Sequence, residues 1–146
     1  MAKTIQSTLD QNPGLYLVLS FFTLFAVNSI VLYCAHLLFP QHVVIGTHAL
    51  NVFWGIFHSM GKLALINTLV IPFVTEYETR RNKIFSSTEW MVTYFVVNFV
   101  TIWLITRFSE QFGLGITSWI IALLLAAALD VAQGLVMMGI EKLRTK

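Results

Sequence analysis

Four long apolar stretches, separated by short polar breaks, dominate the pattern of residues along the chain. They cover about residues 15–39, 49–74, 90–108 and 116–140. A helix needs about 20 apolar residues to cross a hydrocarbon core about 30 Å thick, and each stretch has roughly that length. Lipid offers no partners to backbone N–H and C=O groups, so each span is expected to be a helix. The pattern predicts an all-α, polytopic membrane protein with four transmembrane helices in one domain over residues 1–146.

The polar breaks carry residue types that are common at helix ends. Pro40 and Gly46 bracket the first break, and Pro72 falls in the expected last turn of the second helix. Asn12 and Ser86 offer side-chain oxygens where the first and third helices should begin. The break between the second and third helices, residues 75–89, is the charged one.

Basic residues indicate how the helices are oriented. Those on one side are Lys3, Arg80, Arg81, Lys83, Lys142, Arg144 and Lys146, and Arg107 is on the other. Loops rich in Lys and Arg stay in the cytoplasm, so we expect both termini and the 75–89 loop there. Arg80, Arg81 and Lys83 are also expected to contact anionic lipid headgroups.

Composition supports the membrane assignment and excludes other classes. The chain is 57% hydrophobic and 11% charged, with a mean hydropathy of +0.76. Soluble domains carry about a quarter charged residues, so this chain cannot cover a water-facing surface. A net charge of +2 is too small for a nucleic-acid-binding face. The lone Cys34 excludes an intramolecular disulfide.

The two halves of the chain resemble each other at an offset of seventy residues. Thr23-Leu-Phe-Ala-Val-Asn28 aligns with Thr93-Tyr-Phe-Val-Val-Asn98, four identities in six positions. A unit with two crossings returns the chain to its starting side. The sequence therefore favours two tandem helical hairpins of parallel orientation, related by an axis along the membrane normal.

Charged and polar side chains interrupt the second and fourth spans. Asn51, His58 and Lys62 fall on one face of a helix at spacings of seven and four, and Asp130 with Gln133 lies at comparable depth in the fourth span. A charge at a helix centre costs about 2.5–3.5 kcal/mol unless it is paired or reaches water. Lys62 and Asp130 are thus predicted to pair inside the bundle or across a subunit boundary. Asn51, His58 and Gln133 would support them.

Two interpretations of this charge pair remain open, one structural and one in which it forms part of a proton or ion path. Asn28, Asn67 and Asn98 are neutral and near mid-span, so we expect them to mediate helix association through amide hydrogen bonds. The histidines lack ligand spacing, so no metal site and no cofactor are expected. The sequence also shows no catalytic motif, and an enzyme is not expected.

Residues 62–135 carry a resemblance to a known family. Leu65-Ile-Asn67-Thr-Leu-Val-Ile-Pro72, Val96-Val-Asn98 and Gly115-Ile-Thr-Ser-Trp-Ile-Ile-Ala122 are similar to motifs of phage holin family four, the YvlD-like group. The resemblance implies a small four-helix protein of the bacterial inner membrane without catalytic residues. The charged loop and the Lys62 and Asp130 pair depart from the family pattern.

These features predict a non-enzymatic membrane protein that acts by association. The expected partners are the lipid bilayer and either further copies of the chain or other membrane proteins, as a homo-oligomer or a small accessory subunit. The alternatives are a small ion or proton channel with Lys62, His58 and Asp130 along its path, and a holin-like lesion former.

Overall fold

Four long helices form the protein, as the hydropathy pattern predicts. The computed structural model describes residues 12–145, with side chains up to residue 142. The long helices are α2 (Pro13–Leu38), α3 (Val52–Arg81), α4 (Ser87–Arg107) and α6 (Trp119–Thr145). Each is long and apolar enough to cross a membrane. The all-α class with four candidate spans is confirmed, and the chain has the makeup of a multi-pass membrane protein.

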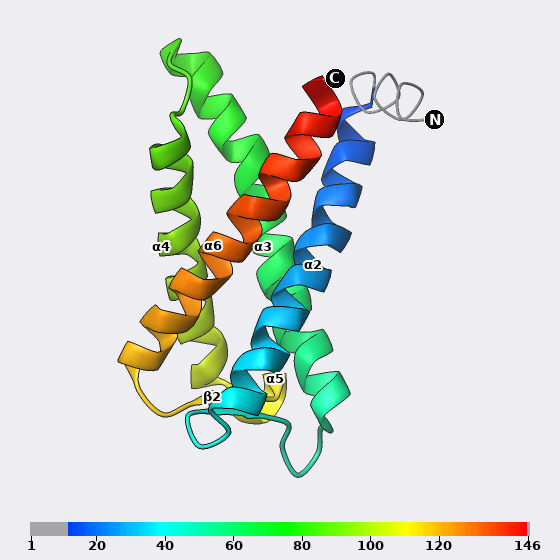
Figure 1. The fold of residues 1–146 in the computed structure, drawn as a ribbon, viewed down its shortest axis with the longest axis vertical. Coiled ribbons are helices and arrows are strands. Elements are labelled where there is room, and N and C mark those ends of the chain that lie inside the picture. Colours follow the sequence, from blue (N-terminus) through cyan, green and yellow to red (C-terminus); the bar gives the residue numbers. More distant parts are fainter. Residues whose placement is uncertain (1–11, 146) are drawn as a thin grey trace.

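The helices pack as a four-cornered bundle in which each helix has two close neighbours. Helix α2 packs against α3 and α6, and α4 packs against the same two helices. Helices α3 and α6 consequently occupy opposite corners, as do α2 and α4 (Figure 1). This arrangement decides which side chains from different helices can meet.

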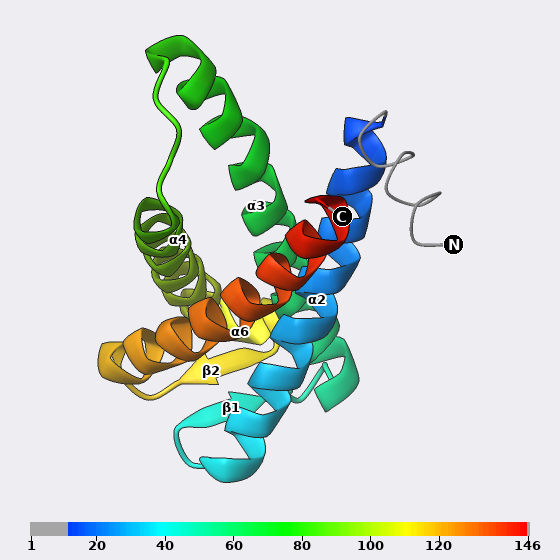
Figure 2. The ribbon, with the colours of Figure 1, turned by 45° about the horizontal axis from the view of Figure 1, so that its top comes forward.

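The two ends of the bundle differ in character. The end that holds the start of α2, the end of α6 and the α3–α4 connection is called the terminal end (Figure 1). The opposite end holds the α2–α3 and α4–α6 connections and is called the sheet end. Towards the terminal end α2 and α3 lean apart, which is visible in both orientations (Figure 2).

A small antiparallel sheet joins the two halves of the chain at the sheet end. Strand β1 (Val43–Ile45) pairs with β2 (Leu114–Ile116), with Val44 opposite Gly115, and the short helix α5 (Ser109–Phe112) precedes β2. Both halves thus run long helix, short strand, long helix, which matches the proposed tandem hairpins. The hydropathy pattern does not predict these strands.

Two glycines allow α3 to approach this sheet closely. Gly113 has a positive φ of 71°, and its carbonyl accepts a hydrogen bond from the Gly46 N–H at 2.8 Å. A Cβ atom on Gly55 of α3 would lie 2.7 Å from the Gly113 carbonyl oxygen. No side chain fits in that space, so the contact requires glycine on α3.

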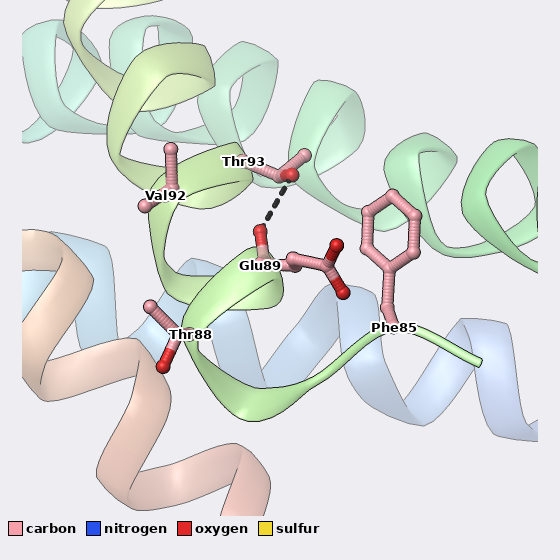
Figure 3. Close-up of a pocket in the computed structure, with 5 residues that line it drawn as sticks. All are labelled: Phe85, Thr88, Glu89, Val92 and Thr93. Atoms are coloured by element: carbon pink, nitrogen blue, oxygen red, sulfur yellow. Dashed lines mark hydrogen bonds between the residues drawn. The ribbon is translucent and has the colours of Figure 1, made fainter. Parts of the chain in front are cut away.

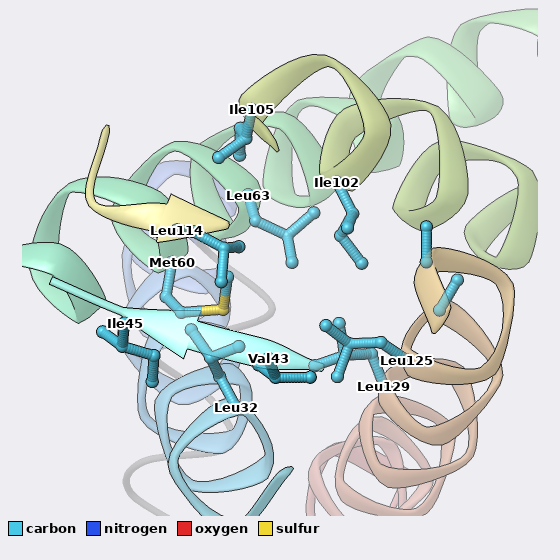
Figure 4. Close-up of a cluster of buried hydrophobic side chains, with 12 residues drawn as sticks. Leu32, Val43, Ile45, Met60, Leu63, Ile102, Ile105, Leu114, Leu125 and Leu129 are labelled. Carbon is cyan, nitrogen blue, oxygen red and sulfur yellow. The ribbon is translucent and has the colours of Figure 1, made fainter. Parts of the chain in front are cut away.

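An apolar core fills the sheet-end half of the bundle. Leu32, Met60, Leu63, Ile102 and Leu129 are fully buried, and they come from all four long helices (Figure 4). Val43, Ile45 and Leu114 of the two strands close this core from below. These side chains pack where all four long helices and both strands meet, which holds this end of the bundle together.

The second helix is longer than predicted. Helix α3 passes through Pro72 and continues to Arg81, so the expected 75–89 loop shrinks to residues 82–86. Proline removes one backbone hydrogen bond but does not end a helix when neighbours hold the next turns. Asn82 ends α3 with a left-handed φ of 49°.

The predicted caps have different outcomes. Ser86 and Glu89 form a complete capping box at the start of α4, as its sequence indicates. The Asn12 side chain makes no capping hydrogen bond, so that prediction is wrong; Pro13 at the first helical position starts α2 instead.

Candidate functional site

One polar side chain from each long helix meets at the centre of the bundle. Asn28 of α2, Asn67 of α3 and Asn98 of α4 are fully buried, and Gln133 of α6 is 2% exposed. All four carry neutral amide groups, each able to donate two hydrogen bonds and accept two. The bundle therefore has a polar centre without net charge.

Hydrogen bonds link these four amides in series. The Asn67 Nδ2 donates to Asn98 Oδ1 at 2.9 Å, and the Asn98 Nδ2 donates to Gln133 Oε1 at 2.9 Å. The Gln133 Nε2 donates to Asn28 Oδ1 at 2.7 Å and to Asn98 Oδ1 at 3.3 Å. We call the four residues the amide chain, because they connect α3, α4, α6 and α2 in that order.

The two ends of the amide chain keep unused hydrogen-bonding capacity. Asn67 Oδ1 at one end and Asn28 Nδ2 at the other have no partner among the described residues. A buried group without a partner costs about 1–3 kcal/mol, so these atoms mark the two positions where the hydrogen bonding of the amide chain is incomplete.

The spacing of buried residues explains why the amides meet. On α2 the buried residues are Ser20, Leu24, Asn28 and Leu32, every fourth position, which keeps Asn28 on the inward face. Asn98 is the counterpart of Asn28 at the offset of seventy residues and also faces inward. Interhelical amide bonds contribute about 0.6–2 kcal/mol each in membranes, so the amide chain can specify how the helices pack.

The predicted ion pair between Lys62 and Asp130 is not formed within the chain. The ion pairs found among residues 12–142 are Arg80 with Glu76 and Lys83 with Glu89. Lys62 lies on α3 and Asp130 on α6, and these helices occupy opposite corners. The prediction matched their depth, but depth alone does not bring two helices together.

Each charge has its own surroundings. Long helical side chains lean towards the helix N-terminus, and α3 begins at the sheet end. Lys62 Nζ accordingly donates to the His58 carbonyl at 3.3 Å and lies 4.5 Å from the ring centroid of Phe112 in α5. Asp130 is 8% exposed and lies on the buried face of α6, the helix that packs against α2 and α4. The Lys62 ammonium group thus lies towards the sheet end, beside Phe112 and not beside Asp130.

The residues expected to support that pair have other roles. Asn51 caps α3 by accepting a hydrogen bond from the Trp54 N–H at 3.0 Å. The His58 ring packs beside Trp54 and Phe57, each 6.0 Å away between ring centroids. Gln133 belongs to the amide chain. The assignment of all three to a charge pair is corrected accordingly.

The Tyr94 side chain turns inward from α4. Its hydroxyl donates to the backbone carbonyl of Asn67 at 3.4 Å, and its ring stacks on Trp90 at 5.8 Å between centroids. Tyr94 therefore braces α4 against α3 beside the end of the amide chain. Trp119, at 56% exposure, remains on the surface of the bundle.

The basic residues of the α3–α4 connection are largely occupied by acidic neighbours. The Arg80 Nε donates to Glu76 at 2.7 Å, and Lys83 Nζ donates to Glu89 at 2.6 Å. Arg81 instead lies 5.9 Å from the ring centroid of Tyr77. The predicted contact of these basic residues with anionic lipid stays a prediction, with Arg81 as the residue not bound to a carboxylate.

A small surface pocket lies beside this connection, at the start of α4. Phe85, Thr88, Glu89, Val92 and Thr93 line it, and the Thr93 hydroxyl donates to the Glu89 carbonyl at 2.8 Å (Figure 3). The Glu89 carboxylate is engaged by Lys83 and by the Ser86 N–H. Glu89, the charged residue that lines this pocket, is therefore part of the cap at the start of α4.

Histidines gather at the sheet end, where they hold the connections. His36 Nδ1 lies 2.8 Å from the Val43 carbonyl oxygen, and His42 Nδ1 lies 3.1 Å from the Thr117 Oγ1. No group of three or more potential metal-ligating side chains occurs in the part of the chain that the structure describes. The polar centre of the bundle is therefore the best candidate site. Comparisons with family models, with curated proteins and with solved structures found no match to this chain.

Proposed function

We propose that this chain is a non-enzymatic integral membrane protein that acts by association, as a homo-oligomer or as a small accessory subunit of a membrane complex. The amide chain is the observation that carries this proposal. Its four side chains are buried at the centre of the bundle, and each of them hydrogen-bonds at least one of the others. Amides do not ionise near neutral pH, so they suit a lasting structural role.

The same observation weighs against conduction through one bundle. The amide chain crosses the middle of the bundle from α3 to α2, and all its members are buried. Lys62 and Asp130 lie on helices at opposite corners, so they do not form one continuous polar path. An ion path, if the protein has one, would lie between protomers.

The outer surface is the part left for partners. Phe73 on the terminal half of α3 and Ile84 in the following connection are 74% and 86% exposed. Apolar groups of this size near the terminal end are suited to a protein partner in or at the membrane. We place this end in the cytoplasm of a bacterium, because Arg80, Arg81, Lys83 and Lys142 share it.

Mass measurement in bilayer nanodiscs tests association. Light scattering should give a multiple of the 16.5 kDa chain mass, or a fixed ratio to one second protein. Phe73→Ala with Ile84→Ala should weaken that assembly, whereas Ile30→Ala, at a 64% exposed site on α2, should not. A lone monomer that conducts ions in vesicles, or that dissipates the membrane potential on expression, would contradict the proposal.

A further inference from the structure

Helix α3 changes character at Pro72. Before this residue, buried side chains recur on every turn of the helix, and after it Val74 is the one buried residue in the rest of α3. The end of α3 also projects beyond the start of α4 (Figures 1 and 2). We call residues 52–71 the stem of α3 and residues 73–81 its arm. The stem is held by the bundle, whereas the arm has few of the buried contacts that fix a segment in place.

Pro72 weakens the helix between the stem and the arm. Proline has no N–H, so the Thr68 carbonyl lacks the donor that an α-helix places four residues later. The proline ring also crowds the preceding turn, and sharp bends in helices occur at prolines for these reasons. Helix α3 can therefore bend here at lower cost than at a residue whose helical hydrogen bond is intact.

Phe85, in the connection that follows, fastens the far end of the arm to α4. Its ring makes edge-to-face contacts with Tyr77 of the arm, 5.7 Å away between centroids, and with Trp90 of α4, 5.9 Å away. Its N–H donates to the Glu78 carboxylate of the arm at 2.6 Å. Figure 3 shows the Phe85 side chain beside Glu89 at the start of α4. We call the contacts of Phe85 with Tyr77, Glu78 and Trp90 the latch.

Helix α4 is fastened to the stem independently of the latch. The Tyr94 hydroxyl donates to the Asn67 carbonyl at 3.4 Å, and the Asn67 side chain donates to Asn98 at 2.9 Å. Both contacts lie on the stem side of Pro72. Loss of the Phe85 contacts would therefore release the arm and leave α4 in its place.

We propose that the arm of α3 is a hinged segment, which bends at Pro72 and is held against α4 by the latch. The structure has the arm in its held position, and release moves the arm away from α4. Phe73 lies on the arm and Ile84 precedes Phe85, so both exposed side chains move with this segment. A partner that binds one position of the arm more tightly would shift the balance between the two positions. The hinge itself goes beyond the proposed association and does not depend on it.

Distances between spin labels, measured by pulsed electron paramagnetic resonance on the full chain in nanodiscs, test this device. One label pair joins Thr79 on the arm to Val100 on α4, and a reference pair joins Leu65 on the stem to Val100. Phe85→Ala should broaden the distance distribution of the first pair and shift it to longer values, and should leave the reference pair unchanged. Met91→Ala, at a 52% exposed site next to Trp90, is the matched control and should change neither pair.

A second substitution identifies the hinge. Pro72→Ala supplies the missing N–H, so in the Phe85→Ala background it should return the arm distances to a narrow distribution. Pro40→Ala, at a proline outside the helices, should not. Phe85→Leu keeps an apolar side chain and should act in the same direction as Phe85→Ala with a smaller shift, which preserves the test if the alanine variant does not assemble.

Three results would overturn the proposal. The first is an arm distribution that neither Phe85 variant changes. The second is a broadened distribution that Pro72→Ala does not narrow, since the bend would then lie elsewhere. The third is equal broadening of the reference pair, because the motion would then belong to the whole bundle and not to the arm.

Discussion

Asn28 and Asn98, seventy positions apart in the sequence, both hydrogen-bond the side chain of Gln133. Asn98 donates to Gln133 Oε1 at 2.9 Å, and Gln133 Nε2 donates to Asn28 Oδ1 at 2.7 Å. The equivalent asparagines of the two halves thus converge on one residue of α6. At the offset of seventy residues, the first half has Leu63 where the second half has Gln133.

Asn98 bonds two other members of the amide chain, as Gln133 does, so its replacement should destabilise the bundle. Asn98→Leu removes bonds to both Asn67 and Gln133 and leaves their amide atoms buried without partners. We expect a loss of about 1–3 kcal/mol in the free energy of unfolding in detergent micelles. Val100→Ala, at a 47% exposed site on the same helix, should change it by less than about 0.5 kcal/mol.

Gly55 and Gly134 should respond oppositely to the same substitution. Gly55→Ala places a Cβ atom 2.7 Å from the Gly113 carbonyl oxygen and should destabilise the bundle by about 1–3 kcal/mol. Gly134→Ala on α6 meets no atom within 4 Å and should be neutral or stabilise by up to about 1 kcal/mol. Thermal unfolding of the two variants side by side decides this. Equal effects would mean that α3 does not approach the sheet so closely.

Lys62 and Asp130 should act independently. Because they lie on helices at opposite corners, the effects of Lys62→Met and Asp130→Asn should add to within about 0.5 kcal/mol in a double-mutant cycle of unfolding. A coupling above 1 kcal/mol would instead indicate that the two charges pair between neighbouring protomers. The cycle repeated at high dilution of the protein separates these cases.

The α3–α4 connection should show a measurable pKa shift. The hydrogen bond from Lys83 to the Glu89 carboxylate raises the pKa of Lys83 above its ordinary value of 10.5. The stabilisation from this contact is therefore complete at neutral pH and is lost as the pH rises through the raised pKa. NMR titration of the Lys83 side chain should show the shift, and Glu89→Gln should abolish it. Gln at this position can still complete the capping box, so the helix start is preserved.

The long helices could be predicted from sequence because hydropathy and length decide whether a segment spans a membrane. The same pattern marked Asn28, Asn67 and Asn98 as mid-span polar residues, and the structure brings all three together. The partners of Lys62 and Gln133 could not be predicted in the same way. Helical spacing gives depth and face, but the packing order of the helices decides which faces meet, and that order is a property of the whole bundle.

The sheet end was missed for a different reason. Val43–Ile45 and Leu114–Ile116 are too short for an alternating pattern to show, and they adjoin apolar helices. The signal that was present lies in Gly46 and Gly113, which follow and precede the two strands and both have positive φ. Glycines next to short apolar segments in the two corresponding connections could have indicated a pairing.

The β1–β2 pairing has a mechanical consequence for the whole molecule. It joins the first hairpin to the second at the sheet end of the bundle, and the amide chain joins them again at the centre of the bundle. Beyond that depth α2 and α3 lean apart (Figure 2). This opening lies within the first hairpin, so any rocking of α2 against α3 is greatest at the terminal end, where a partner would have the longest lever arm.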